Sequence, residues 1–178
     1  MEKALICLND IVNEGVIDQY AIGGAIGASF YIEAVNTEDI DAFVFMTPGP
    51  GGVITLGSIY EALKVRGGIV KDEHVVIDNW PIQILPAYKP LVENALREAV
   101  STTFGTVPTR VFSAEYICAI ALDTGRLKDY LRVATFIEQD QVDRAKLLAI
   151  VKEYGLEDKL ARVENWKYTE GSSDGQHH

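Results

Sequence analysis

The chain has 178 residues, of which 48% are hydrophobic and 24% charged, and its formal net charge at pH 7 is -10. This hydrophobic content suits a folded core and argues against wholesale disorder. The negative charge disfavours a long nucleic-acid footprint, because such a surface repels a polyanion on average. No apolar run approaches membrane-spanning length and no signal-peptide core follows Met1, so we expect a cytoplasmic protein in which Cys7 and Cys118 are reduced core residues.

The first part of the chain alternates predicted helices and strands. Hydrophobic periodicity, with glycine and proline as stop signals, defines these elements. In chain order we expect a helix at 2–15, a strand at 19–24 that ends in two glycines, a helix from 25 to about 36, a strand at 40–46, a loop at 47–52, a helix at 56–68, two strands within 73–87 joined at Asp78-Asn79, a helix at 88–102 and a strand at 109–113.

From Ser113 onwards the pattern is helical throughout. Ser113 and Glu115 indicate a helix start, Gly125 a break between helices, and Asp140 the cap of another helix. We therefore predict an α+β fold in which a small mixed β-sheet with flanking helices is followed by a C-terminal helical bundle. The expected divisions are an α/β core at 1–112, a helical region at 113–168 and a disordered, polar tail at 169–178.

Two carboxylates, Asp39 and Asp41, stand one residue apart at the start of a predicted strand. Side chains alternate along a strand, so these two point to the same face while Ile40 points into the core. Two neighbouring carboxylates repel each other and stay ionised most easily around a divalent cation. Mg²⁺ prefers such hard oxygen ligands and completes its shell with waters or substrate phosphates. The alternative is a solvated sheet edge.

The glycine pair Gly23-Gly24 lies between a predicted strand and a predicted helix. Glycine has no side chain, so a phosphate can approach this backbone closely, and N–H groups at a helix start suit an anion. The alternative is a tight strand-to-helix turn with no ligand.

Together, Gly23-Gly24 and the strand that opens with Thr37-Glu38-Asp39-Ile40-Asp41 resemble the signature of the nucleotidyltransferase superfamily related to DNA polymerase beta. The resemblance covers roughly residues 18 to 86. It implies that the glycine turn holds a nucleoside triphosphate, and that the Asp pair binds Mg²⁺ (or Mn²⁺) for in-line transfer with pyrophosphate as the leaving group. Thr37 would cap or orient the loop before Asp39.

The family normally adds a third carboxylate from a neighbouring strand. That position falls on Gln83, whose amide forms hydrogen bonds but cannot act as a base or supply negative charge. Asp78 is the one nearby acid that could substitute. A single-metal or weakened site is therefore an open alternative.

The segment "EYICAIALDTGRLKD" resembles the C-terminal motif of abortive-infection type nucleotidyltransferases, many of which are toxins of toxin–antitoxin pairs. It keeps Arg126, Lys128 and Asp129, which the resemblance assigns to nucleotide binding, but has Ala121 and Arg132 where the family has a lysine and an acid. The alternative is a solvated helix face with routine ion pairs.

Two functions remain in competition. The first is a Mg²⁺-dependent nucleotidyltransferase that moves a nucleoside monophosphate from a nucleoside triphosphate to a protein hydroxyl, an RNA end or a small molecule, with a toxin-like role and a protein partner as further implications. The second is a lapsed enzyme that acts as a nucleotide- or protein-binding module. His74, a lone histidine in the ordered region, is expected to be structural.

Overall fold

The computed structural model describes residues 1–33, 37, 39–45 and 56–170. These residues form two compact units. The first contains Met1–Phe30 and the described residues from 37 to Ser113, and the second contains Tyr31–Glu33 and the described residues from Ala114 onwards. Each unit is described by itself below.

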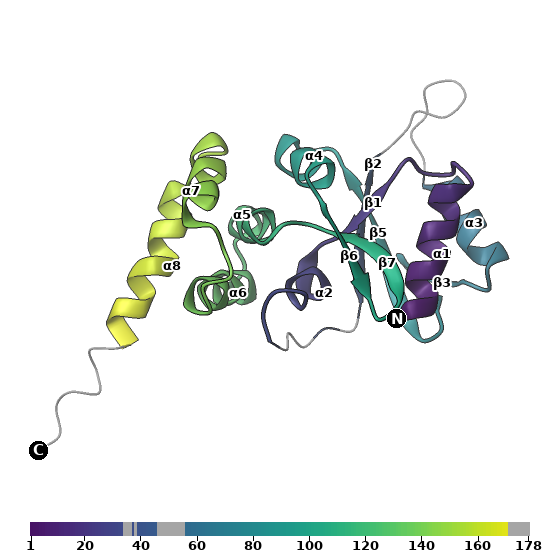
Figure 1. Ribbon diagram of the computed structural model, residues 1–178, viewed down its shortest axis with the longest axis horizontal. Coiled ribbons are helices and arrows are strands. Elements are labelled where there is room, and N and C mark those ends of the chain that lie inside the picture. Colours follow the sequence, from purple (N-terminus) through teal and green to yellow (C-terminus); the bar gives the residue numbers. More distant parts are fainter. Residues whose placement is uncertain (34–36, 38, 46–55, 171–178) are drawn as a thin grey trace, which may run out of the picture. The chain divides into compact units, whose positions relative to one another are not determined.

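The first unit is built on a mixed sheet (Figure 1). Among the described residues its elements are α1 (Glu2–Asn13), β1 (Tyr20–Ile22), α2 (Gly24–Ala28), β2 (Ile40–Phe45), α3 (Gly57–Val65), β3 (Ile69–Lys71), β4 (His74–Ile77), β5 (Trp80–Ala87), α4 (Pro90–Arg97), β6 (Val100–Phe104) and β7 (Val107–Val111). The strand order is β3-β4-β5-β2-β1-β7-β6. The β2–β5 and β1–β7 pairs are parallel, and the other neighbours are antiparallel.

One face of the sheet is the core of this unit. Ile40, Ala42 and Val44 alternate along β2 with more exposed residues and are fully buried. Helices α1 and α3 lie on this side (Figure 1), and the Tyr20 hydroxyl on β1 donates a hydrogen bond of 2.9 Å to Asn9 on α1. Complete burial of a valine or isoleucine side chain, as at Val44 and Ile40, contributes about 1.5–3 kcal/mol to stability. The other face, which α2 and α4 contact, carries the alternate residues of the same strands.

The predicted hairpin around Asp78-Asn79 is confirmed. Ile77 pairs with Trp80, and Asp78 and Asn79 both have positive φ, at 50° and 66°. Two such residues form the two-residue turn whose twist matches the strands on either side. The turn leaves Asp78 four residues along the strand from His74, or about 13 Å, so Asp78 cannot replace a carboxylate at position 83.

The sequence pattern did not predict strands β3 and β6. The helix expected at 88–102 overlaps the first residues of β6, and no element was expected at the position of β3. Both strands lie at edges of the sheet. All three residues of β3 are exposed, and Val100 of β6 is 45% exposed, so neither strand has the alternation of buried and exposed residues that marks a half-buried strand.

The second unit is helical over its described residues. Its helices are α5 (Ala114–Thr124), α6 (Leu127–Glu138), α7 (Arg144–Glu153) and α8 (Glu157–Glu170). The predicted mixed sheet with flanking helices, followed by helices alone, is therefore confirmed. Gly125, with a φ of 73°, does separate α5 from α6. Helix α8 continues two residues into the expected tail, and 171–178 lie outside the described residues.

The prediction that Asp140 caps a helix is wrong. Asp140 follows α6 with a φ of 53°. Asp143 caps α7 instead, because its carboxylate accepts hydrogen bonds from the backbone N–H groups of Ala145 and Lys146 at 2.9 and 3.0 Å. Asp140 and Asp143 both precede the segment whose apolar residues recur at helical spacing. The path of the chain after α6 decides which carboxylate reaches the first turn of α7.

Both cysteines are free and buried, as predicted: Cys7 is 5% and Cys118 1% exposed. Burial raises the pKa of each thiol, and the negative charges of Asp10 and Glu115, respectively, raise it further. Since the thiolate is the reactive form, we expect Ellman's reagent at pH 8 to leave the native protein unmodified and to titrate both thiols in guanidinium chloride. Fast reaction of either cysteine in the native protein would contradict this burial.

Candidate functional site

Four neighbouring strands place one residue each in a row across the face opposite the core. Asp41 on β2 is the register partner of Gln83 on β5, Gln83 pairs with His74 on β4, and His74 pairs with Lys71 on β3. Paired residues project from the same face, so these four side chains line up. Strands lie about 4.8 Å apart, so the row runs about 14 Å from Asp41 to Lys71.

Asp41 at the head of this row rests on the backbone of Gly24. A Cβ added to Gly24 would lie 1.7 Å from Asp41 Oδ2, and Gly24 has a φ of 56°, which a side chain disfavours. The N–H of Gly23 donates a hydrogen bond of 3.0 Å to the Asp41 carbonyl. The carboxylate can occupy this position only because residue 24 has no side chain.

Gly23 has a different reason to be glycine. A Cβ at this position would lie 2.6 Å from the Phe43 ring and 3.0 Å from the Phe112 ring. These two rings pack with their centroids 4.8 Å apart. The identity of Gly23 is therefore explained by packing, and that of Gly24 by the carboxylate beside it.

The helix after the glycines is much shorter than predicted. We expected it to continue to about residue 36, but α2 contains five residues, Gly24–Ala28, and residues 34–36 lie outside the described residues. The Ser29 hydroxyl donates to the Ile26 carbonyl at 2.7 Å and satisfies one of the carbonyls at the helix end. A helix this short has a small dipole. An anion at the glycine turn would therefore be bound by individual backbone N–H groups rather than by the helix dipole.

Asp39 precedes β2, and its two carboxylate oxygens have different neighbours. The Thr37 hydroxyl donates to Asp39 Oδ1 at 3.0 Å, and His74 Nε2 lies 3.8 Å from Asp39 Oδ2. The Asp39 side chain remains 40% exposed. Thr37 therefore orients the carboxylate, and His74, which was expected to be structural, lies beside Asp39 in the candidate site. The sequence could have predicted the position of His74, because counting residues back from the Asp78-Asn79 turn along both strands brings His74 opposite Gln83.

A pocket of about 380 Å³ lies beside Asp39. It is formed by the β3–β4 hairpin and the start of β5. Its lining residues are Asp39, Lys71, Asp72, His74, Val76 and Pro81. All belong to the first unit.

The donor groups at this site suit a metal ion that arrives with its own ligands. Asp39 and Asp41 supply carboxylates, whereas Gln83 supplies only an amide. Within the described part of the chain, no cluster of three or more His, Cys, Asp or Glu side chains could hold a metal ion. Mg²⁺ is usually bound by one or two carboxylates together with substrate phosphates and water. The residues therefore fit one Mg²⁺ shared with a triphosphate, and they do not form a closed protein site.

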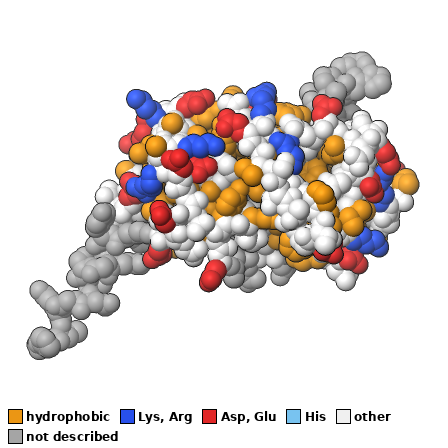
Figure 2. Space-filling model, in the orientation of Figure 1, with side chains coloured by type: hydrophobic (Ala, Val, Ile, Leu, Met, Phe, Trp, Pro, Cys, Tyr) orange, Lys and Arg blue, Asp and Glu red, His pale blue; other side chains and the backbone are white. Residues whose placement is uncertain are grey.

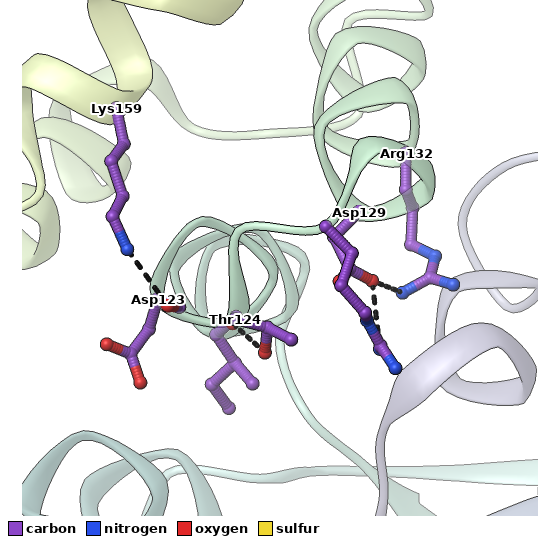
Figure 3. A network of polar contacts seen from close by, with 7 residues as sticks. Asp123, Thr124, Asp129, Arg132 and Lys159 are labelled. Atoms are coloured by element: carbon purple, nitrogen blue, oxygen red, sulfur yellow. Dashed lines mark hydrogen bonds and ion pairs between the residues drawn. The ribbon is translucent and has the colours of Figure 1, made fainter.

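In the second unit, Asp129 lies in a cluster with two arginines (Figure 3). Arg126 Nε lies 2.6 Å from Asp129 Oδ2, and Arg132 Nη1 lies 3.4 Å from Asp129 Oδ1. Asp129 is 1% exposed and Arg126 60%. The aspartate thus holds two guanidinium groups within its own unit. Lys128 on the same helix is exposed. A nucleotide-binding role for Arg126, Lys128 and Asp129 stays a prediction.

Comparisons with solved structures identify the fold. The chain is 15% identical to an antigenic nucleotidyltransferase-like protein from Paracoccidioides brasiliensis, with a TM-score of 0.57 over 96% of this chain and 90% of that one. It is 17% identical to ANT(2″)-Ia in complex with adenylyl-2″-tobramycin, with a TM-score of 0.52 over 90% of this chain and 97% of that one. It is 16% identical to the solution structure of the antibiotic-resistance factor ANT(2″)-Ia, with a TM-score of 0.50 over 95% of this chain and 100% of that one.

These likenesses show that the chain has the nucleotidyltransferase fold, as the glycine pair and the Asp pair implied. No protein-family model matches the chain, and neither does any curated sequence. The narrower resemblance to the abortive-infection type stays a prediction. Among the described residues, no helix is long and apolar enough to cross a membrane.

The contact between Gly24 and Asp41 can be tested by stability alone. We expect Gly24→Ala to destabilise the protein more than Gly15→Ala, because Gly15 has a similar φ of 71° but open space around its Cα. Asp41→Gly should then relieve part of the loss. In a double-mutant cycle by urea unfolding, Gly24→Ala and Asp41→Gly should show a coupling of about 0.5–3 kcal/mol. Additive effects would mean that the carboxylate does not rest on Gly24.

The Asp129 cluster predicts an asymmetric response to mutation. Asp129→Ala should reduce the free energy of unfolding by about 3 kcal/mol, because it leaves the mostly buried Arg132 without its counter-charge. Arg126→Ala removes an exposed partner and should change stability by less than about 1 kcal/mol. Urea denaturation measures both, and equal losses would contradict a buried, structural Asp129.

Proposed function

We propose that this chain is a nucleotidyltransferase that binds a nucleoside triphosphate with Mg²⁺ or Mn²⁺ and transfers the nucleoside monophosphate to an acceptor hydroxyl. The observation that carries the proposal is the contact of the Asp41 carboxylate with the backbone of Gly24, two residues along the chain from the Asp39 carboxylate. The contact supports the proposal because it brings a carboxylate, the type of ligand that Mg²⁺ prefers, close to the glycine turn where the triphosphate would bind. The fold supports the same class of function.

In this proposal each residue of the site has a defined task. The turn at Gly23-Gly24 would contact the phosphates of the triphosphate through the backbone N–H groups at the start of α2. Asp39 and Asp41 hold the metal ion, which would offset the charge that develops on the phosphates during transfer. Thr37 keeps the Asp39 carboxylate in position through its hydrogen bond of 3.0 Å.

The transfer itself is an in-line displacement. The acceptor oxygen forms a bond to the α-phosphorus, the bond from that phosphorus to the bridging oxygen of the β-phosphate breaks, and pyrophosphate leaves. The acceptor hydroxyl loses its proton in this step. The Gln83 amide next to Asp41 cannot take that proton, which would pass to water or to the imidazole of His74, the register partner of Gln83. We therefore expect slow transfer compared with a site that has a carboxylate at this position.

Gln83 also supports a second candidate function, a protein that binds nucleotide without transferring it. Two carboxylates can retain a metal–nucleotide complex even where no group accepts the proton. The position where the resembling family has a phosphate-binding lysine is Ala121, which is 4% exposed and adds no charge. Binding and transfer must therefore be measured separately.

A small molecule is the acceptor class that the comparisons favour. The ANT(2″)-Ia structure contains adenylyl-2″-tobramycin, which is a nucleotidylated small molecule. The net charge of -10 disfavours an RNA end as acceptor. A toxin-like role, a protein partner and a cytoplasmic location stay predictions from the sequence.

Metal-dependent nucleotide binding tests the proposal. Calorimetric titration with ATP, GTP, CTP and UTP in Mg²⁺ or Mn²⁺ should show binding of at least one nucleotide, weakened at least tenfold by EDTA, by Asp39→Ala or by Asp41→Ala. Asp18→Ala removes an exposed carboxylate of the same unit and should leave the affinity unchanged. A folded wild-type protein that binds none of the four nucleotides would overturn the proposal.

Gln83→Glu tests whether the missing carboxylate limits transfer. A glutamate here faces the same side as Asp41 and could accept the acceptor's proton. General-base catalysis typically contributes a factor of about 10²–10⁴, so pyrophosphate release should rise by about 10² or more. Gln83→Leu, of similar size but without polar atoms, is the control and should give no increase. An unchanged rate in Gln83→Glu would favour the binding-protein alternative.

A further inference from the structure

We propose that the pocket beside Asp39 is the acceptor site, and that it takes a small hydroxyl-bearing molecule of little net charge. The pocket is lined by Asp39, Lys71, Asp72, His74, Val76 and Pro81 and is called the hairpin pocket below. This inference rests on the proposed nucleotidyl transfer and specifies which acceptor that transfer uses and where it binds.

The position of the hairpin pocket follows from the row of side chains across the sheet. Asp41 is at the glycine end of the row, where the phosphates would lie, and His74 and Lys71 are at the other end. In-line displacement requires the attacking oxygen to approach the α-phosphorus from the side opposite the leaving pyrophosphate. With pyrophosphate over Gly23-Gly24 and the metal at Asp39 and Asp41, the attacking hydroxyl comes from the side of the hairpin pocket.

Asp39 connects the two ends of the site. Its carboxylate belongs to the proposed metal site and also lines the hairpin pocket, and His74 Nε2 lies 3.8 Å from its Oδ2. A hydroxyl bound against His74 would thus lie next to a metal-binding carboxylate. The His74 ring is 27% exposed, so it can contact a ligand in the pocket.

The size and lining of the hairpin pocket suit a small molecule. Its volume of about 380 Å³ falls in the usual range for small-molecule sites, about 300–1,000 Å³. Val76 and Pro81, register partners on β4 and β5, supply apolar surface. Asp39, Lys71, Asp72 and His74 supply polar groups that can fix a hydroxylated ligand in one orientation.

The charge of the hairpin pocket argues against an RNA acceptor. Lys71 and Asp72 are both exposed, and neither forms an ion pair with another described residue. Apart from Asp39, whose charge the proposed metal ion would offset, the charged lining residues are this one lysine and this one aspartate, whereas RNA-binding grooves concentrate Lys and Arg. On the face shown in Figure 2, basic side chains are likewise scattered among acidic ones and form no continuous basic track. A neutral or zwitterionic hydroxyl compound meets no repulsion here.

The test compares two tryptophan variants on neighbouring strands. Val76→Trp fills the hairpin pocket. Val70→Trp is the matched control, because Val70 precedes Lys71 on β3, points to the opposite face and is already 40% exposed. Lys71→Ala/Asp72→Gly is a second pocket variant, which removes two exposed side chains, suits the φ of 52° at residue 72 and keeps the test valid if Val76→Trp fails to fold. Nucleotide affinity is measured for each variant by calorimetry.

Transfer is measured with the α-³²P form of the nucleotide that binds. The acceptors supplied are glycerol, D-glucose, myo-inositol and L-serine, with an RNA oligonucleotide bearing a free 3′-hydroxyl and casein as macromolecular acceptors. We expect label on at least one small molecule, an at least tenfold loss of that transfer in Val76→Trp and an at least fivefold higher KM for the acceptor in Lys71→Ala/Asp72→Gly. Val70→Trp should transfer normally, and all variants should retain nucleotide affinity.

The outcomes separate this inference from the proposed function. Label on RNA or casein alone, label on none of the small molecules, or undiminished transfer in both pocket variants overturns the acceptor site while metal-dependent nucleotide binding stands. A wild-type protein that binds no metal–nucleotide complex overturns the proposed function, and the acceptor site with it.

Discussion

The close contact between the Asp41 carboxylate and the Gly24 backbone is the constraint on which the rest of the candidate site depends. A side chain at position 24 would overlap Asp41 Oδ2, so the carboxylate and the bare backbone require each other. The contact joins the end of β1 to β2, which pair in antiparallel register from Tyr20–Val44 to Ile22–Ala42. The pairing of β1 with β2 thus fixes the position of the Asp41 carboxylate, and the absence of a side chain at Gly24 leaves space for it.

Sheet register extends this constraint to residues far away in sequence. Side chains alternate with a period of two, so a slip of one residue in β4 or β5 would turn His74 and Gln83 into the core. The Asp78-Asn79 turn prevents such a slip, because two residues with positive φ define a tight hairpin in which Ile77 pairs with Trp80. Counting from that pair places His74 opposite Gln83. The location of a candidate binding residue is therefore determined by a turn about 13 Å away.

The parts of the site that could be predicted from the sequence are those that depend on local spacing. Asp41 projects from the face opposite Ile40 because side chains alternate along β2, and glycine pairs mark an unusual backbone, so both features were visible in a short segment. Gln83 could be placed because it lies between two core isoleucines, Ile82 and Ile84. Each of these inferences needs only the residues on either side.

The features that were missed depend on pairing or on competition between alternatives. Lys71 lies on β3, an edge strand whose three residues are all exposed and carry no periodic signal. Asp143 rather than Asp140 caps α7, a choice that depends on how the chain leaves α6. The length of α2 was overestimated because apolar residues continue after Ala28 at helical spacing, although the helix ends there. Tertiary context decides such cases, since helix propensity is only a weak preference.

In the proposed function, an amide at Gln83, where the resembling family has a carboxylate, would affect metal binding and proton transfer in different ways. Two carboxylates and an amide attract Mg²⁺ less strongly than three carboxylates, so the free protein should hold the ion weakly. The phosphates of a nucleotide supply the missing negative charge and oxygen ligands. Each ligand should then strengthen the binding of the other by the same factor, because coupling between two binding sites is reciprocal. Proton transfer has no such compensation, since neither the nucleotide nor the amide replaces a base. The proposed site would thus be better suited to hold a metal–nucleotide complex than to turn it over quickly.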